Sequence, residues 1–403
     1  MADKTYQVLL DGQAADQAFY GDVVSLTVEE NTGIPNLLHL RLALTKQDDG
    51  SWNYLDDDRL ALFATIGVRV GFRGGQGLAG ALGGILGGND PLEPVFDGYI
   101  TALNVSLGSR PGETFLDADA IDTSVLLSLK EKVVAWPDLA DHEIVERIVT
   151  PYGVTPRIDS TPTVHQEDDT VVMQHATDIQ FIRELARRNG GEFYFETDRD
   201  TGEIQAFFRA LDLGGTPQPD LLVQFGEKSN LRNFSVRVEG QRPTTVQTAQ
   251  MDIASAAPNT GEASDTQFTK LGSTDDNTLI ADATAKAAPE ETPEILVLGA
   301  PSSDPTELQT TAQAVRDEAA WFIRAGGEIN SDAYGTVLRP HRLVLVNGAG
   351  NQYNGKYYVT RVVHQLKTGG EYAQTFEARR NARDLEGTEQ FGSSGLGLPN
   401  PGF

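Results

Sequence analysis

The glycine spacing of GQGLAG, Gly75 to Gly80, is the first pattern that could do chemistry, because it matches the turn that holds a dinucleotide pyrophosphate. That turn must lead directly into a helix. Here the continuation is ALGGILGG, and each glycine inside a helix costs about 0.8–1 kcal/mol relative to alanine. We therefore interpret the segment as a long, apolar hairpin loop that contacts another protein chain.

The sequence contains no convincing set of residues for metal binding or for hydrolysis either. The histidines show neither an HExxH pattern nor another metal-ligand spacing: His39, His142, His165, His175, His341 and His364. The acidic run QEDD, which ends at Asp169, could hold a divalent cation, but adjacent acids in an acidic chain are typical of a solvated loop. The sequence has no GxSxG turn and no acid pair that stands out from its background. We predict no catalytic residues, no metal and no cofactor, and we do not expect an enzyme.

One enzymatic alternative stays open at this point, a protein that acts on cell wall or polysaccharide. Its basis is the abundance of carboxylates together with aromatic residues expected at the surface, such as Trp52, Trp136 and Tyr194. Replacing a single acid, for example Glu192 by Gln, would test for such an activity.

Composition and charge exclude several classes of partner. The chain has 403 residues, 39% of them hydrophobic, and a formal charge of -26 from 58 acidic and 32 basic residues. Stable binding to nucleic acid or to anionic lipid is disfavoured, because both need clustered Lys and Arg. Cysteine is absent, and the start MADKTYQVLL has no basic segment followed by a long apolar run. We expect a folded protein that is made in the cytoplasm and has no integral membrane segment.

A helix followed by an aromatic hairpin is the clearest local signal. Thr177 can cap the helix while Gln180 reaches back to it, which is a capping box. Gly190 and Gly191 would end the helix. The stretch EFYFE then alternates as a strand does, and it returns through a turn as EIQAFF. We predict a helix packed on a hairpin whose purpose is shape.

The elements before this unit read as short strands separated by turns, which predicts an antiparallel β-barrel over residues 1–115, with a glycine-rich loop at 71–90. Alternation is clearest where four leucines share one face of a strand: Leu38, Leu40, Leu42 and Leu44. A small α/β domain over 116–225 follows, and it contains a second helix that Pro151 stops.

Sequence patterns typical of β-strands return after residue 225, which predicts a second barrel over 226–384. Residues 241–293 hold few large apolar residues, so we expect extended connections there. A helix is expected over 305–325, with Gly326 and Gly327 as its terminator. The tail, 385–403, is rich in Gly, Pro and Ser and is expected to be flexible until it docks. The fold class is therefore mainly β with an α/β insert.

Four stretches in this order resemble the baseplate hub of contractile phage tails, namely the phage late control protein D family and the hub-like N-terminal half of the VgrG proteins. They are TDIQFIRELARRNGGEFYFE, IVERIVTPYGVTP, the closing block from GTVLRPHRLVLVNG to EYAQTFEARRN, and VFDGYITALNVSL. The resemblance spans about residues 5–384 and implies two tail-tube-like antiparallel barrels around a small α/β domain. VgrG proteins continue into a spike, and this chain ends at Phe403 before one, which implies a separate spike polypeptide.

What the resemblance implies for function is structural. Three copies would form a ring whose two barrels per chain give six similar positions, adapting a six-fold tail tube to a three-fold spike. The implied partners are two further copies, tail-tube subunits, the spike and other baseplate components, in a phage tail or a phage-derived injection device. Apolar residues of the glycine-rich loop and the tail are the candidate partner contacts: Leu78, Leu82, Ile85, Leu86, Phe391, Leu396, Leu398 and Phe403.

Overall fold

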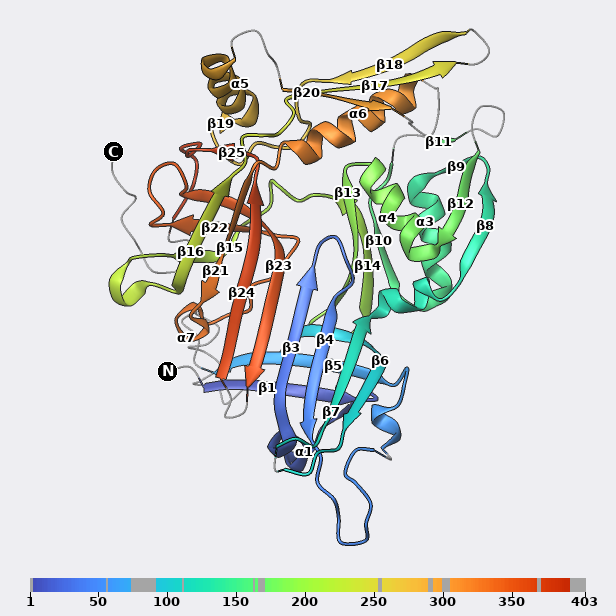
Figure 1. Cartoon of the computed structure of the whole chain (residues 1–403), viewed down its shortest axis with the longest axis vertical. Helices are drawn as coiled ribbons and strands as arrows, with labels where there is room; N and C mark the ends of the chain where they lie inside the picture. Colours follow the sequence, from blue (N-terminus) through green and yellow to red (C-terminus); the bar gives the residue numbers. More distant parts are fainter. Residues whose placement is uncertain are drawn as a thin grey trace.

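The computed structural model describes residues 3–55, 57–73, 92–110, 112–161, 164–165, 171–252, 256–288, 293–298, 305–367 and 371–391. Its largest element is a curled, 13-stranded sheet that contains strands from both the N-terminal and the C-terminal part of the chain. Figure 1 shows the N-terminal strands below, the C-terminal strands at the left and a separate α/β unit at the right. The predicted class, mainly β with an α/β insert, is confirmed.

The N-terminal strands form a first half-barrel. Its elements are β1 Asp3–Leu10, β2 Gln13–Ala14, α1 Gln17–Asp22, β3 Val23–Asn31, β4 Leu37–Ala43, β5 Thr65–Arg73, β6 Glu93–Ser106 and β7 Phe115–Asp122. The alternating leucines predicted for β4 do face the core, since Leu38, Leu40 and Leu42 are buried there beside Leu26 and Val28 of β3. The first half-barrel thus has a continuous apolar core.

The α/β unit follows the first half-barrel in the sequence and lies to one side of the sheet (Figure 1). Its elements are β8 Glu131–Trp136, β9 Leu139–Ala140, α3 Asp141–Val149, β10 Thr155–Ile158, β11 Val164–His165, β12 Val172–Thr177, α4 Asp178–Arg188, β13 Gly191–Thr197 and β14 Ile204–Ala210. The Gln180 half of the predicted capping box of α4 is confirmed, since the Thr177 backbone N–H donates to Gln180 Oε1 at 3.3 Å, whereas the buried Thr177 hydroxyl makes no hydrogen bond within the described residues. Gly190 follows at φ +65°, which suits the predicted end of the helix.

The C-terminal strands form a second half-barrel with a long insertion. Its strands are β15 Gln218–Leu222, β16 Leu231–Val238, β21 Ile323–Ile329, β22 Leu343–Asn347, β23 Gly355–Lys367 and β24 Glu371–Arg380, with α7 Ser331–Tyr334 and β25 Ala382–Arg383 as small additions. The order β16-β21-β24-β23-β22 repeats the order β3-β4-β7-β6-β5 of the first half-barrel, and β23 joins the two by pairing with β3. One strand pattern therefore occurs twice in the chain.

Residues 241–293 correct the sequence prediction, because they are not extended connections. They contain the hairpin β17 Thr245–Asp252 and β18 Ala257–Ala263, followed by β19 Thr274–Asp275 and the helix α5 Asp276–Ala287. The strand β20 Glu294–Leu298 then pairs in parallel with β17. This insertion has little core of its own, since Val246, Ala263 and Ala312 are its buried apolar cluster.

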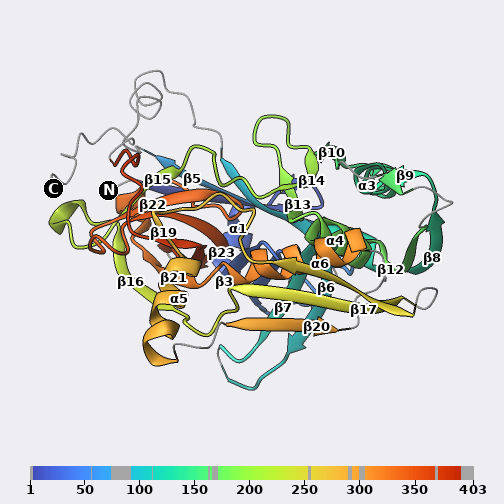
Figure 2. The same ribbon diagram turned by 90° about the horizontal axis from the view of Figure 1, so that it is seen from above.

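The predicted helix over 305–325 is present but shorter. Helix α6 spans Pro305–Ala319 and lies along β17 in both views (Figure 2). Gly326 and Gly327 are not its terminator, because they lie inside β21, which pairs with β16 on one side and β24 on the other. Two pairing partners thus outweigh the local glycine signal. Within the described residues, no helix is long and apolar enough to cross a membrane.

Candidate functional site

Strand β13 points two kinds of side chain in opposite directions. Phe193 and Phe195 enter the core of the α/β unit, as the period of a strand requires. Glu192, Tyr194 and Glu196 therefore face the other way, towards the second half-barrel, and contact residues that precede β22. The stretch EFYFE is thus a two-sided strand that packs on one face and carries charge on the other.

The partner of this charged face is the segment Arg339–Arg342, which we call the basic clip. Arg339 lies with its Nη2 2.9 Å from Glu30 Oε1 of β3 and 3.8 Å from Glu196 Oε1. Its backbone is fixed as well, because Gln218 Oε1 accepts from Arg339 N at 2.8 Å and Gln218 Nε2 donates to Arg339 O at 2.9 Å. One arginine therefore contacts both half-barrels and the α/β unit.

His341 forms the second contact of the basic clip. Its Nδ1 lies 2.6 Å from Glu192 Oε2, and its ring stacks on Tyr194 with centroids 3.5 Å apart. Tyr358 of β23 donates its hydroxyl to the same Glu192 oxygen at 2.7 Å. Burial raises the pKa of Glu192, but His341, Tyr358 and Arg379 outweigh burial, so the pKa lies below its ordinary value. The Glu192 carboxylate is therefore held in its charged form.

Glu30 joins the two half-barrels directly. Its Oε2 lies 2.7 Å from Nε2 of the buried His364 in β23, whose Nδ1 is 2.7 Å from the Tyr372 hydroxyl of β24. Each buried carboxylate of this junction therefore has a cationic or hydrogen-bonding partner, as burial demands. Such an arrangement fixes the orientation of three structural units, because its groups are engaged with one another.

These positions bear on the residues that the enzymatic alternative rests on. Glu192, the acid chosen to test it, is nearly buried in the junction and engaged by three side chains. Tyr194 is buried, and Trp52 and Trp136 are half-buried, so the expectation of exposed aromatics is wrong for Tyr194. In the part of the chain that the structure describes, no group of three or more His, Asp or Glu side chains could hold a metal ion.

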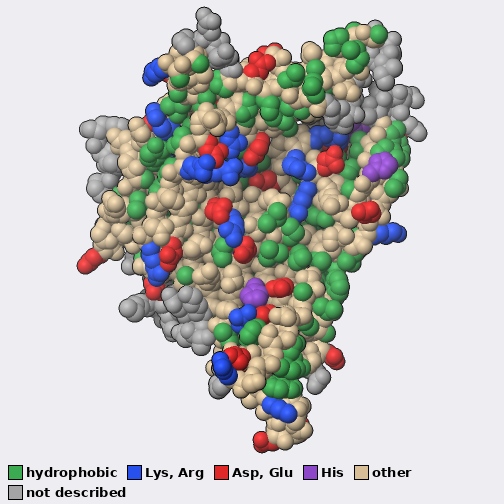
Figure 3. Space-filling view, in the orientation of Figure 1, with side chains coloured by type: hydrophobic (Ala, Val, Ile, Leu, Met, Phe, Trp, Pro, Cys, Tyr) green, Lys and Arg blue, Asp and Glu red, His purple; other side chains and the backbone are tan. Residues whose placement is uncertain are grey.

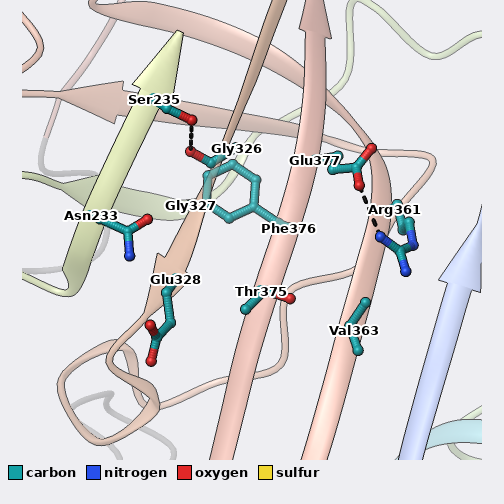
Figure 4. Close-up of a pocket in the computed structure, with 10 residues that line it drawn as sticks. All are labelled: Asn233, Ser235, Gly326, Gly327, Glu328, Arg361, Val363, Thr375, Phe376 and Glu377. Atoms are coloured by element: carbon teal, nitrogen blue, oxygen red, sulfur yellow. Dashed lines mark hydrogen bonds and ion pairs between the residues drawn. The ribbon is translucent and has the colours of Figure 1, made fainter.

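A shallow pocket of about 310 Å³ lies on the second half-barrel, on strands β16, β21, β24 and β23 (Figure 4). Gly326 and Gly327 form its floor without side chains. Its two carboxylates are engaged, since Arg361 Nη1 donates to Glu377 Oε1 at 2.8 Å and Glu328 is paired with Arg232. The pocket is thus a polar depression in a sheet, with its acids neutralised by arginines.

The residues predicted to contact partners fall mostly outside the described residues. The predicted contact residues outside the described part are Leu78, Leu82, Ile85, Leu86, Leu396, Leu398 and Phe403. The GQGLAG and QEDD segments also lie outside it. Phe391 is described, and it lies half-buried in a turn. Sequence reasoning missed the basic clip. The sequence signal for it is the pattern RPHR together with the acids at the two ends of EFYFE, which share one face of a strand.

The family model described as the Alg8 N-terminal domain matches residues 85–368, so the chain belongs to that family. A search of curated proteins found no match.

Solved structures share the fold. The 43 kDa tail protein of prophage MuSo2 from Shewanella oneidensis is 11% identical at a TM-score of 0.63, covering 95% of this chain and 100% of that one. A tail protein from Neisseria meningitidis MC58 is 11% identical at a TM-score of 0.61, covering 94% and 97%. A Francisella PdpA-VgrG complex is 9% identical at a TM-score of 0.50, covering 97% of this chain and 60% of the other. The chain therefore has the fold of phage tail and baseplate hub-like proteins, which confirms the resemblance predicted from sequence.

Proposed function

We propose that the protein is a structural baseplate hub of a contractile tail or injection device, and that three copies form a ring between a six-fold tail tube and a three-fold spike. The observation that carries this proposal is the strand order that occurs twice in one chain. Three chains with two similar half-barrels each offer six similar positions to a tube. The insertion between β16 and β21 occurs once per chain and so gives the same ring a three-fold feature.

The partners follow from the proposed role: two further copies, tail-tube subunits on one side, a separate spike protein on the other, and neighbouring baseplate components. We keep the division into residues 1–115, 116–225, 226–384 and 385–403 as part of the proposal. The glycine-rich loop and the tail remain the proposed contacts with the tube and with the spike or a neighbouring hub chain. The particle containing the ring would assemble from protein made in the cytoplasm.

A mass measurement tests the ring. Each chain has a formal charge of -26, so three chains repel one another, and salt should promote their association. We expect light scattering at near-physiological salt, with the spike protein present, to give the mass of a complex that contains three chains. A monomer under these conditions, at every protein concentration tried, would contradict the proposal.

A further inference from the structure

The chain contains one complete junction between half-barrels, which shows how such units join. The second part of β23 pairs antiparallel with β3, from Arg361 opposite Asn31 to Lys367 opposite Ser25. The side chains that point into this junction are apolar or hydrogen-bonded and buried: Val362, His364 and Leu366 are 0%, 0% and 3% exposed. Residues at the equivalent positions of another such edge should be buried as well.

Strand β6 is the equivalent of β23 down to its irregularities. The pairing of β6 with β7 shifts at Thr101, and the pairing of β23 with β24 shifts at Thr360. Each threonine donates its hydroxyl to a backbone carbonyl of the neighbouring strand, Thr101 to Asp119 O at 3.3 Å and Thr360 to Glu377 O at 3.2 Å. The two strands therefore correspond residue by residue, with Thr101 at the place of Thr360.

The turns before the neighbouring strands β5 and β22 correspond too. Phe63 and His341 both have a positive φ, +63° and +61°. Phe63 N donates to Ile100 O at 2.7 Å, and His341 N donates to Val359 O at 3.0 Å. In both half-barrels these are the last backbone bonds between the long strand and the chain that precedes β5 or β22.

For β23 that partner is β3, but for β6 the described residues offer none beyond Ile100. Strand β5 pairs with β6 only as far as Tyr99. Leu103, Val105 and Leu107, which occupy the places of Val362, His364 and Leu366, are 37%, 45% and 58% exposed. Figure 3 shows hydrophobic side chains gathered over the region of β6 and β7. An apolar strand edge is thus left open at one end of the eight-stranded run from β16 to β6.

Strand β16 at the opposite end is the equivalent of β3. Its pairing with β21 shifts after Leu231, as the pairing of β3 with β4 shifts after Val23. Within the described residues β16 pairs with β21 alone, and it lies at the left margin of the molecule, across from β6 (Figure 1). Val238 is 46% exposed on this edge. The two open edges are therefore the two halves of the junction that β23 and β3 complete inside the chain.

We propose that β6 of one copy pairs antiparallel with β16 of the next, in the register of the β23–β3 junction. The equivalences place Leu103 opposite Val238, Val105 opposite Val236 and Leu107 opposite Phe234. This inference rests on the proposed ring and names its contact. Because the edges differ and lie on opposite sides, the pairing is head-to-tail, which closes a ring when the rotation permits. The apolar pairs replace water-exposed surface, and the edge backbone groups gain hydrogen bonds.

Cysteine cross-linking tests the register cleanly, since the chain contains no cysteine. The double variant Leu103→Cys with Val238→Cys should form disulfides between copies, because directly opposite residues have Cβ atoms about 4.5–5.5 Å apart. The control Leu103→Cys with Phe234→Cys places the second thiol four residues along the strand, roughly 13 Å away, and should not cross-link. Both variants are studied as full chains at about 1 M salt, where the Debye length is about 3 Å.

The outcomes separate the register from the ring. Equal cross-linking of both double variants would overturn the register. Cross-linking of the single variant Val238→Cys would overturn it too, because that result would mean that two β16 edges pair with each other. A three-chain mass without Leu103–Val238 cross-links would overturn this contact and leave the ring standing. Monomer without cross-links would overturn both.

A charge variant gives an independent readout. Val105→Asp should weaken association at least ten-fold without changing the melting temperature of the monomer, since Val105 is already half-exposed there. The matched control is Val133→Asp, a more exposed apolar residue on β8, which should leave association unchanged. Equal losses in both variants would contradict the role of the β6 edge.

Discussion

The two half-barrels share a strand order but differ in what is attached to them. In the first, β3 and β4 are joined by residues 32–36; in the second, residues 239–322 stand between the equivalent strands β16 and β21. The first has a continuous apolar core, whereas the second also carries the basic clip and buried charged side chains such as Arg316 and Arg380. The repeated strands thus define the frame, and the additions to one copy give the molecule its asymmetry.

The largest effect should come from breaking the point where the basic clip meets both half-barrels. Arg339→Met leaves the buried carboxylate of Glu30 and the partly buried one of Glu196 without their shared cation. Removing one partner of a buried ion pair costs about 3–5 kcal/mol, so we expect a loss of that order in the free energy of unfolding measured with urea. Far-UV circular dichroism would check that the variant still folds.

The neighbouring arginine supplies the control. Arg342 pairs with Glu196 but is half-exposed, and exposed pairs contribute about 0–1 kcal/mol. Arg342→Met should therefore cost much less than Arg339→Met. Similar losses in the two variants would mean that the basic clip acts through surface charge alone and does not lock the half-barrels together.

An element of this fold can be predicted from the sequence when the contacts that determine it join residues close together in the sequence. Helix α4 was predicted with its cap because Thr177 and Gln180 lie three residues apart and bond to each other. The end of α6 was not, because Gly326 and Gly327 gain partners in β16 and β24, far away in the sequence. Long-range pairing overrides a local terminator.

The junction shows the same limit. Glu30 meets His364 and Arg339 across more than 300 residues, and no spacing in the sequence links them. Likewise, α5 was missed because one buried apolar residue, Ile280, gives its sequence almost no helical stripe. Helix α5 is joined to α6 by the ion pair between Asp276 and Arg316, a contact that only the folded insertion creates.

A smaller and more local effect is expected in the insertion. Arg316 and Asp276 are both fully buried, with Nη1 and Oδ2 2.9 Å apart, and they join α6 to α5. Arg316→Leu should speed hydrogen exchange in α5 and leave exchange in β3 and β23 unchanged, because the frame does not depend on this pair. The double variant with Asp276→Leu should recover part of the loss, since it removes the unpaired charge. Faster exchange throughout the sheet would show that the insertion and the frame unfold as one unit.

The smallest expected effect is a pH dependence confined to the cap of α5. Asp275 accepts from Thr278 N at 2.9 Å and from Lys270 Nζ at 2.6 Å. Burial raises the pKa of Asp275, but these partners outweigh it and lower the pKa to about 2. Because the folded pKa is depressed, the stabilisation is complete above the unfolded value of about 3.9 and is lost as the pH falls towards 2.

Asp275→Asn isolates this contribution, because the amide oxygen can still accept at the cap while the charge is gone. Urea unfolding should find the natural protein more stable than the variant by about 1 kcal/mol near neutral pH, a modest figure because Lys270 is partly exposed to solvent. That difference should shrink as the pH falls from about 4 and vanish only below the folded pKa of about 2. Lys270→Met should weaken the same pH dependence, since it removes the cation while the hydrogen bonds with Thr278 still lower the pKa. If the natural protein and the Asn variant differ equally at every pH, Asp275 contributes as a hydrogen-bonding cap and its charge has no part in holding α5 to the second half-barrel.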